Sequence, residues 1–312
     1  MRAYSYMIAV RVHAYGGPEQ LILEESEIPA PEAGQTLVRV SAAGVGPWDA
    51  LIRTGHSGLP QRLPVTPGSD IAGVMQSTGE PVFGVTNRSF TGGYAQYAAA
   101  STSSIARKPT NLSFVEAASV PVVAVTAWQM LFDRAGVRAG QSVLVHGAAG
   151  NVGAYAVQLA RWAGARVIAV AGAGDAGYVR GLGAAEVIDF RTQRFEELVA
   201  GVDAVIDTVG GDTQERSFKV IKPGGMLVSS VSQPSDALAA EHNVRTVYFI
   251  VEVPAAQLER IAQLIDDGTL KVDLGVVLSM ADARKAHEML AGTLPHPRGK
   301  IVLDVDLIGE NA

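Results

Sequence analysis

A glycine-rich segment that directly follows an apolar run constrains the fold of this chain more than any other feature. Residues 147–153 read GAAGNVG; they follow the strand-like run Ser142–His146 and open the apolar helical stretch Val152–Trp162. Glycine lets the backbone turn sharply and approach a pyrophosphate, and a helix N-terminus offers unpaired N–H groups. In this strand–turn–helix context the segment predicts a dinucleotide site, although its spacing is GxxGxxG rather than GxGxxG. A glycine turn that binds no ligand is the alternative.

Strand-like runs alternate with helical stretches throughout the second half of the chain. These runs are Ser142–His146, Val167–Ala171, Glu186–Phe190, Asp203–Asp207, Met226–Val231 and Thr246–Val251. Strands separated by helices of this length imply right-handed crossovers and a parallel sheet. The runs are nearly continuous in valine and isoleucine, which is typical of a sheet covered on both faces. The pattern predicts an α/β fold with a doubly wound parallel sheet.

The first third and the tail follow other patterns. Leu37–Ala42 alternates in polarity, and turn-forming residues interrupt the chain over 29–34 and 58–67. This pattern predicts an irregular antiparallel β domain with few helices, which ends near Ser119. In the tail, Leu258–Ile265 and Asp282–Leu290 read as helices and Lys300–Val305 as a strand. The pattern leaves open whether the tail is a third piece or returns to the first domain.

Composition excludes several classes of function. The chain has 312 residues, and 25 basic against 31 acidic side chains give a net charge of −6, which argues against a nucleic-acid partner. It has no cysteine, and its six histidines show no HxxxH or HExxH spacing, so we expect no disulfide and no zinc or other metal site. Met7–Val10 is too short for a secretory signal, and the apolar region 117–132 is interrupted by polar residues. We therefore expect no membrane association and a cytoplasmic location.

The end of the second strand-like run bears on which nicotinamide cofactor binds. An acidic residue at this point would bind the ribose diol of NAD, and its absence leaves room for a 2′-phosphate. Residues 169–172 read AVAG, which favours NADPH, with NADH as the alternative because Asp175 lies only slightly further on. Arg191 and Arg180 would supply positive charge near the phosphate.

Several segments in order carry a resemblance to a known family. They are VRVHAYGGPE at 10–19, AGVGPWD at 43–49, PGSDIAGV at 67–74, DTVGG at 207–211 and RGKIVL at 298–303, together with the glycine segment. The chain resembles the zinc-independent quinone oxidoreductase (zeta-crystallin-like) branch of the medium-chain dehydrogenase/reductase superfamily. This resemblance implies a GroES-like catalytic domain over residues 1–119, a Rossmann NADP(H)-binding domain over 120–253, and a return to the catalytic domain over 254–312. It also implies a homodimer formed through an edge strand at Thr246–Val251, and a start at either Met1 or Met7.

Carried over position by position, the resemblance implies a set of cofactor contacts. The pyrophosphate would lie against Gly150, Asn151, Val152 and Gly153, and the adenine ribose near Ala171, Gly172 and Arg191. Strand-end contacts would come from Val209, Gly210, Ser230 and Val231. The nicotinamide would meet Phe249, Val251, Thr126, Gly46 and Pro47, with Lys300 near the cofactor.

The chain departs from the family pattern around the expected substrate pocket, which Gly46, Trp48 and Ser57 would border; core packing is the alternative role for Trp48. The family has asparagine where this chain has Gly46, tyrosine in the region of His56–Ser57, and commonly lysine near Gly174 and Asp175. Zinc-dependent relatives place ligands where this chain has Gly46 and Ser69, which agrees with a metal-free site.

The histidines and one charged pair supply the remaining candidates. His56 is the candidate proton donor because its pKa suits proton delivery near neutrality, and a surface loop histidine is the alternative. His146 is expected to end a strand and form a local hydrogen bond. Asp49 and Arg53 stand four residues apart, which predicts a local pair on a helix.

These observations lead to one functional hypothesis and two alternatives. The first is a zinc-free, NADPH-dependent reductase that transfers hydride to a small-molecule quinone or α,β-unsaturated carbonyl compound. The second is an enoyl-thioester reductase of a secondary pathway, for which Arg53 and Arg62 would supply charge at the pocket mouth. The third is an NADPH-binding protein with little catalytic activity.

Overall fold

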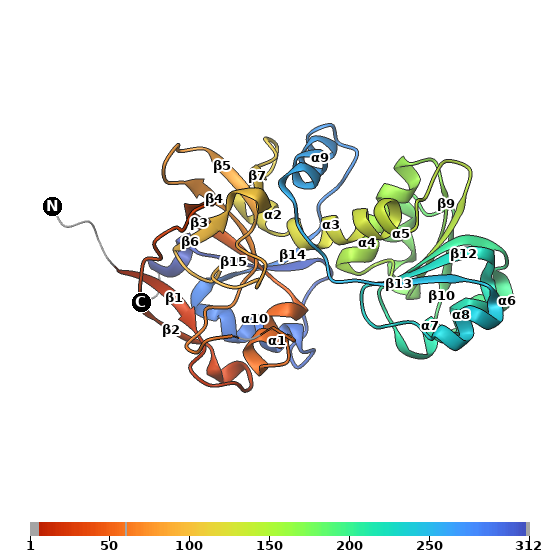
Figure 1. The fold of residues 1–312 in the computed structure, drawn as a ribbon, viewed down its shortest axis with the longest axis horizontal. Helices are drawn as coiled ribbons and strands as arrows, with labels where there is room; N and C mark the ends of the chain where they lie inside the picture. Colours follow the sequence, from red (N-terminus) through yellow and green to blue (C-terminus); the bar gives the residue numbers. More distant parts are fainter. Residues whose placement is uncertain (1–5, 60, 310–312) are drawn as a thin grey trace. The chain divides into compact units, whose positions relative to one another are not determined.

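The computed structural model describes residues 6–59 and 61–309; of the two candidate starts, Met7 lies within these ranges and Met1 lies outside the described residues. The chain forms two compact units (Figure 1). Unit 1 joins residues up to 122 with those from 253 onward, and unit 2 comprises residues 123–252.

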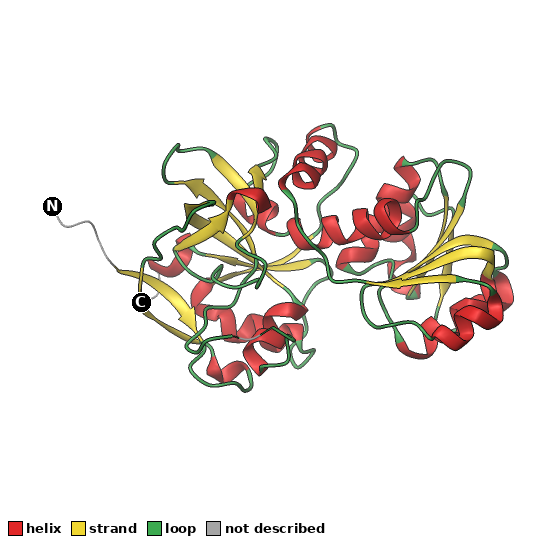
Figure 2. Cartoon of the chain, in the orientation of Figure 1, coloured by secondary structure: helices red, strands yellow, loops and turns green. Residues whose placement is uncertain are grey.

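Unit 2 is built on a six-stranded parallel sheet (Figure 2). Its strands are β8 (Ser142–His146), β9 (Arg166–Ala171), β10 (Glu186–Asp189), β11 (Val202–Asp207), β12 (Ile221–Ser229) and β13 (Arg245–Tyr248). They lie in the order β10-β9-β8-β11-β12-β13, so the winding reverses between β8 and β11. In an open sheet of this kind, ligands bind beyond the carboxyl ends of the strands at the point of reversal.

Helices follow the strands of unit 2 as the alternating pattern predicts. They are α4 (Asn151–Trp162), α5 (Ala176–Leu182), α6 (Phe195–Leu198), α7 (Gly211–Ser217) and α8 (Asp236–His242). Leu144, Val205 and Leu227 on the central strands are fully buried, as is Leu159 on α4. Apolar residues on both sheet faces are thereby removed from water, which explains the continuous valine and isoleucine runs.

Two strands end two or more residues before the point that their apolar runs predict. The run Met226–Val231 predicted a strand through Val231, but β12 ends at Ser229. The run Thr246–Val251 predicted a strand through Val251, but β13 ends at Tyr248. The register explains both differences, because Ser229 is the last residue of β12 and pairs with Tyr248, so the residues beyond have no ladder partner.

Unit 1 contains a seven-stranded sheet and a separate two-stranded hairpin. The hairpin strands are β1 (Tyr6–Arg11) and β2 (Ile22–Glu27); the sheet strands are β3 (Gln35–Val45), β4 (Asp70–Met75), β5 (Pro81–Val85), β6 (Tyr97–Ser101), β7 (Ile105–Arg107), β14 (Leu274–Ser279) and β15 (Lys300–Asp304). The long strand β3 pairs antiparallel with β4, β6 and β15. Because β15 comes from the tail, the tail completes the sheet of the N-terminal segment.

Unit 1 also holds two short helices that the turn-rich sequence did not predict, α1 (Pro47–Thr54) and α2 (Phe114–Ala118). In the tail, α9 (Ala255–Asp266) and α10 (Ala283–Leu290) confirm the two predicted helices. Proline at the first position of α1 suits a helix start, and Gly55, with φ 78°, ends it in the left-handed region. Ser113 and Glu116 cap α2 reciprocally through their side chains. Helix α3 (Pro121–Trp128) continues into a π-helical segment over Gln129–Arg134.

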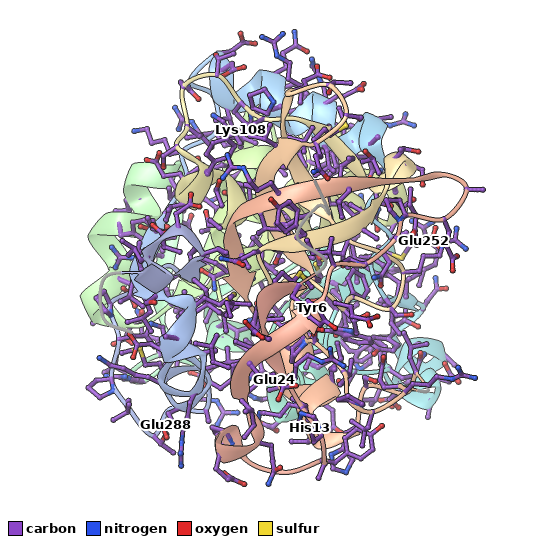
Figure 3. The ribbon with its side chains drawn as sticks, turned by 90° about the vertical axis from the view of Figure 1, so that its left-hand side faces the viewer. Tyr6, His13, Glu24, Lys108, Glu252 and Glu288 are labelled. Atoms are coloured by element: carbon purple, nitrogen blue, oxygen red, sulfur yellow. The ribbon has the colours of Figure 1, made fainter. Side chains whose placement is uncertain are left out.

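The β1–β2 hairpin carries a polar contact on its exposed side. His13, just after β1, and Glu24 on β2 lie beside one another (Figure 3), with 2.9 Å between Nε2 and Oε1. The His13 side chain is exposed and that of Glu24 is partly exposed, so this contact contributes little to stability.

A close backbone approach fixes the turn between β8 and α4, and substitutions of glycine test it. A Cβ on Gly153 would lie 2.1 Å from the carbonyl oxygen of Gly147. We expect Gly153→Ala to lower the free energy of unfolding by roughly 2 kcal/mol or more, because the backbone must shift to relieve the overlap. Chemical denaturation monitored by circular dichroism measures this.

Gly181 on α5 provides the matched control. A Cβ at Gly181 would meet no atom within 4 Å, so Gly181→Ala is expected to raise stability by about 0.5–1 kcal/mol through the greater helix propensity of alanine. Equal effects of the two substitutions would contradict the close approach.

Candidate active site

The glycine segment lies at the carboxyl end of β8, at the point where the sheet reverses its winding. Gly147 turns the chain with φ 65°, and Gly150 precedes α4 as its N-terminal cap. The N–H of Gly150 donates to the Gly147 carbonyl at 2.9 Å. The first N–H groups of α4 have no carbonyl within the helix to receive them. Gly150, Asn151, Val152 and Gly153 therefore form a turn whose free backbone donors suit a pyrophosphate.

A buried carboxylate, that of Asp207, accepts hydrogen bonds from the residues at the ends of β11 and β12. Asp207, at the end of β11, is fully buried and accepts the N–H groups of Val209 at 3.0 Å and Gly210 at 2.9 Å. Its second oxygen accepts the Ser229 hydroxyl at 2.8 Å and the Gln214 side-chain amide at 2.9 Å. These bonds fix the loop that bears two of the expected cofactor residues and connect it to the end of β12. The sequence motif DTVGG contained this aspartate, but its organising role was not predicted.

The ends of β12 and β13 bring further expected residues to the same edge of the sheet. The Ser230 N–H donates to the Asp207 carbonyl at 3.2 Å, and the Val231 N–H donates to the Ser229 hydroxyl at 3.2 Å. The Val231 side chain is about half exposed. Because all six strands are parallel, their carboxyl ends share one edge, and these residues follow it.

The segment after β13 is anchored by two side chains from the π-helical segment. The Gln129 amide donates to the Glu252 carbonyl at 2.6 Å, and the Arg134 guanidinium lies 5.1 Å from the centre of the Phe249 ring. Val251 lies within this anchored segment, and Thr126 is buried on α3.

An exposed aromatic ring lies beside the expected adenine position. Ala171 ends β9 and Gly172 follows it; a Cβ on Gly172 would lie 3.7 Å from the Phe190 ring. The Arg191 guanidinium lies 5.6 Å from the centre of that ring. The structure thus brings Ala171, Gly172 and Arg191 together around Phe190, which the sequence analysis did not select.

His146 has the structural role that the sequence predicted. It is fully buried at the end of β8, with 2.8 Å between Nε2 and the Ser217 hydroxyl oxygen. Its ring also meets the Phe195 ring edge-on, with 4.6 Å between their centres. Burial lowers the pKa of His146 to about 4, although the nearby Asp207 raises it. The imidazole is therefore neutral at pH 7.

In unit 1, a second buried carboxylate holds the start of α1. One oxygen of Asp49 accepts the Gly46 N–H at 2.8 Å and the Tyr94 hydroxyl at 3.1 Å; the other accepts the Gly68 N–H at 3.1 Å. Asp49 is 1% exposed and Tyr94 fully buried. Burial raises the pKa of Asp49 to about 7, against the lowering effects of the Gly46 N–H and the Lys300 ammonium.

The hydrogen-bond chain continues from Tyr94 to Arg53. The Arg53 Nε–H donates to Nδ1 of His287 at 3.2 Å, and Nε2 of His287 lies 3.4 Å from the Tyr94 hydroxyl. Burial, followed by the charge of Arg53, lowers the pKa of His287 to about 3, so the ring is neutral. Its single proton must then lie on Nε2, because Nδ1 accepts from Arg53. All three bonds donate in one direction, from the cationic Arg53 toward Asp49.

This arrangement shows that the predicted Asp49–Arg53 pair is wrong. Arg53 instead binds His287 and donates to the Gly16 carbonyl at 2.5 Å. The four-residue spacing places both residues on α1, but stronger tertiary partners lie within reach of each. The same bonds bury Arg53 to 5% exposure, so it supplies no free charge at a pocket mouth.

Lys300 and Gly46 lie next to each other in unit 1. The buried Lys300 ammonium donates to Asp70 at 3.2 Å, and a Cβ on Gly46 would lie 3.2 Å from Nζ. The missing side chain at position 46 therefore leaves the ammonium directly beside the backbone. Pro47 follows as the first residue of α1.

The other expected substrate residues surround α1 in different ways. The Trp48 ring meets the Phe90 ring edge-on, with 5.4 Å between the centres. Ser57 is buried, and its hydroxyl donates to the Leu59 carbonyl at 3.1 Å. His56 is exposed just beyond α1, as the alternative of a surface loop histidine predicted.

Comparisons with known proteins identify the family. A family model described as alcohol dehydrogenase GroES-like domain matches residues 32–88, and one described as zinc-binding dehydrogenase matches residues 182–303. The quinone oxidoreductase of Mus musculus is 33% identical over 309 residues, covering 90% of this chain and 93% of its own. The solved quinone oxidoreductase of Coxiella burnetii superposes with a TM-score of 0.88 at 30% identity, covering 96% of this chain and 99% of its own.

The chain belongs to the quinone oxidoreductase branch of the medium-chain dehydrogenase/reductase superfamily. The expected fold, a Rossmann parallel sheet with a GroES-like β domain, is confirmed. The chain is also 34% identical to the 2-methylene-furan-3-one reductase of Solanum lycopersicum over 248 residues, covering 73% of this chain and 61% of that one. It is therefore an NAD(P)-dependent oxidoreductase of the quinone and enone reductase type.

Two further properties of this family member concern metals and membranes. Across the described part of the chain, no three His, Asp or Glu side chains cluster in a way that could hold a metal ion. Within residues 6–59 and 61–309, none of the helices combines the length and apolar character needed to cross a membrane.

The raised pKa of Asp49 has a measurable consequence for stability. The unfolded chain loses this proton near pH 3.8, whereas the native state keeps it to about pH 7. The native state therefore binds more protons between these values, and this contribution to stability is lost as the pH rises through 7. Asp49→Asn cannot ionise, so its stability relative to wild type should increase from pH 4 to 7 by at most about 4 kcal/mol.

Urea denaturation of both proteins at several pH values measures this difference. Above about pH 8 the difference should be constant because Asp49 is then ionised in both states. A difference that is the same at pH 4 and pH 7 would show that Asp49 does not titrate in this range.

Proposed function

We propose that this protein is a zinc-free, NADPH-dependent reductase that transfers hydride to quinones or α,β-unsaturated carbonyl compounds. The observation that carries the proposal is the glycine turn at the reversal point of the sheet, in a chain 33% identical to a quinone oxidoreductase. The position of the glycine turn in the sheet supports a dinucleotide site. The similarity to quinone oxidoreductases supports a quinone or a related compound as the hydride acceptor.

The residues at this edge fit a dinucleotide. Gly153 lets the start of α4 pack closely against the Gly147 carbonyl, and the N-terminal end of α4 offers N–H donors for a phosphate. Val209, Gly210, Ser230 and Val231 would then border the cofactor along the strand ends, with Phe249, Val251 and Thr126 toward the nicotinamide. Bound NADPH supplies the hydride; the protein's own contribution is to bind, orient and polarise.

The preference for NADPH rests on the end of β9. Ala171 and Gly172 place no carboxylate where the ribose diol of NADH would be bound. Arg191 lies over the exposed Phe190 ring, so a guanidinium and an aromatic face are available together. A guanidinium suits a 2′-phosphate because it donates in a planar fork.

The donors that the chain lacks support the proposal of a zinc-free site. It has no cysteine, and position 46 is a glycine with no side chain to offer a ligand. Ser69 is buried and is a weak zinc ligand compared with thiolate or imidazole.

On the substrate side, Gly46, Trp48 and Ser57 would border the pocket. Asp49 is a positioning residue here, since its carboxylate holds the Gly46 N–H. Lys300 lies beside Gly46, and its buried ammonium pairs with Asp70. His56 forms none of the hydrogen bonds of this group, so the geometry does not favour it as proton donor over solvent.

The enoyl-thioester alternative depended on Arg53 and Arg62 for positive charge at the pocket mouth, and the structure removes Arg53 from that role. Arg53 is bound within unit 1 by His287 and Gly16, which leaves Arg62 as the remaining charge. The quinone and enone reading is therefore the better supported one.

Cofactor titration followed by turnover tests the proposal. Nucleotide fluorescence should show tighter binding of NADPH than of NADH, and addition of 9,10-phenanthrenequinone or an alkenone should oxidise the bound NADPH. Arg191→Gln should weaken NADPH binding about tenfold or more through the loss of a charge-assisted bond, and leave NADH binding unchanged. Arg138→Gln, which removes an exposed arginine elsewhere in unit 2, is the control.

The possible outcomes separate the alternatives. Binding of NADPH without oxidation by any acceptor would favour an NADPH-binding protein with little activity. Absence of nucleotide binding would overturn the proposal as a whole.

We also propose a homodimer formed through β13. This strand pairs with β12 on one side and is the last strand of the six-stranded sheet, so its other side can receive a strand from a second copy. Sedimentation velocity at micromolar concentration should give twice the monomer mass of 32.6 kDa. A single species at the monomer mass would contradict the dimer.

A further inference from the structure

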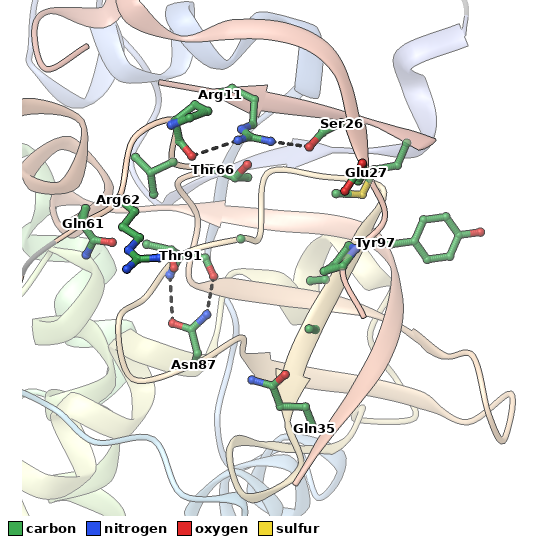
Figure 4. Close-up of a pocket in the computed structure, with 17 residues that line it drawn as sticks. Arg11, Ser26, Glu27, Gln35, Gln61, Arg62, Thr66, Asn87, Thr91 and Tyr97 are labelled. Carbon is green, nitrogen blue, oxygen red and sulfur yellow. Dashed lines mark hydrogen bonds between the residues drawn. The ribbon is translucent and has the colours of Figure 1, made fainter. Parts of the chain in front are cut away.

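A polar cavity opens in unit 1 among residues that the proposed function does not use. Its volume is about 430 Å³, and none of the proposed cofactor or substrate residues lines it. The walls come from the β1–β2 hairpin, residues 61–66, the loop 87–92 and strand β6 (Figure 4). Small-molecule sites in proteins typically measure roughly 300–1,000 Å³, so the cavity has the size of a ligand site.

Two buried donors in its walls have no acceptor. The Arg11 guanidinium is held by the Ser26 hydroxyl and by the Pro64 carbonyl, the latter at 3.0 Å (Figure 4). Its Nε is nevertheless buried without a hydrogen-bond partner, and so is Nε2 of Gln61. Because these two atoms are closed off from solvent, a ligand in the cavity would not reach them, and Arg11 would contact it through its terminal guanidinium nitrogens.

A third donor in the same walls is a free cation. Arg62 is exposed, and among the residues that the structure describes it forms no hydrogen bond or ion pair. Arg11 and Arg62 together face one carboxylate, that of Glu27, so the charged lining is positive by one unit. The Asn87 amide is already satisfied by the Thr91 backbone, at 2.8 Å to its carbonyl.

The lining therefore matches a ligand with several acceptor oxygens and a negative charge. Guanidinium groups bind phosphate through paired N–H donors, and the donors here come from two separate segments, which suits a tetrahedral group. Apolar side chains of Met7, Val65 and Ala98 line the rest of the cavity. These side chains would contact the carbon skeleton of an organic ligand. Inorganic phosphate has no carbon skeleton and would leave this apolar wall without a contact.

We propose that this cavity binds a phosphate group carried by a small organic molecule, with Arg11 and Arg62 as the phosphate ligands. The site is independent of the hydride-transfer reaction, because it shares no residue with the proposed cofactor and substrate contacts. The organic phosphate is held by the arginines at one end and by the apolar wall at the other.

Calorimetric titration of the full chain with three probes tests the site. Glycerol 3-phosphate should bind more tightly than inorganic phosphate, and glycerol should not bind. Arg62→Gln should weaken glycerol 3-phosphate binding about tenfold or more, as expected for loss of a charge-assisted bond. Arg107→Gln, which removes an exposed arginine on β7 outside the cavity, should leave binding unchanged.

A second substitution tests the sign of the charge. Glu27→Gln removes the one carboxylate of the lining and should tighten glycerol 3-phosphate binding by several-fold. Weaker binding in this variant would mean that the cavity selects a cationic group and would overturn the proposal. Both Arg62 and Glu27 are exposed, so neither substitution threatens folding, and thermal melting verifies this.

Other outcomes also decide the matter. Binding of glycerol 3-phosphate that survives Arg62→Gln lies elsewhere, for instance at the glycine turn, and would overturn the proposal. Tighter binding of inorganic phosphate than of glycerol 3-phosphate would support the arginine pair and overturn the organic ligand. Failure of NADPH binding or turnover would leave these results unaffected.

Discussion

A carboxylate removed from water has to be met by hydrogen-bond donors, and each unit of this protein arranges its proposed site around one such group. In unit 2, Asp207 accepts hydrogen bonds from the N–H groups of Val209 and Gly210 and from the hydroxyl of Ser229. In unit 1, Asp49 accepts hydrogen bonds from the N–H groups of two separate loops and from the buried Tyr94 hydroxyl. The loops beside the proposed cofactor and substrate positions are thus held by hydrogen bonds to a buried side chain as well as by packing.

In unit 1 the buried carboxyl group is also connected to a cation. A chain of hydrogen bonds links Asp49 to Arg53 through the neutral ring of His287 and the hydroxyl of Tyr94. Each member of this chain donates toward Asp49, so the bonds polarise one another in one direction. His287 belongs to α10 in the tail, so hydrogen bonds as well as apolar contacts hold the C-terminal segment within unit 1.

Much of unit 2 was predictable because its signals are local. A glycine turn between an apolar strand and a helix requires only neighbouring residues, and β8, α4 and β9 formed where the pattern placed them. The ends of β12 and β13 were less predictable, since the apolar runs continue beyond the last ladder pair of Ser229 with Tyr248. Strand length there depends on the partner strand rather than on the residues themselves.

In unit 1, the polar partners were the part that the sequence did not reveal. The spacing of Asp49 and Arg53 predicted a local pair, but Arg53 bonds to a histidine 234 positions away. The cavity lined by Arg11 and Arg62 likewise joins segments far apart in the chain.

The sequence by itself determined the class of fold, the glycine turn and the family, because each depends on short-range patterns or on ordered motifs. Only the tertiary structure decided which donors meet each buried carboxylate, that the tail completes the sheet through β15 and β3, and that Arg53 is not a free charge. The physical reason is that a buried polar group takes whichever partner the fold brings within hydrogen-bond distance, and that choice is made between segments that sequence spacing does not relate.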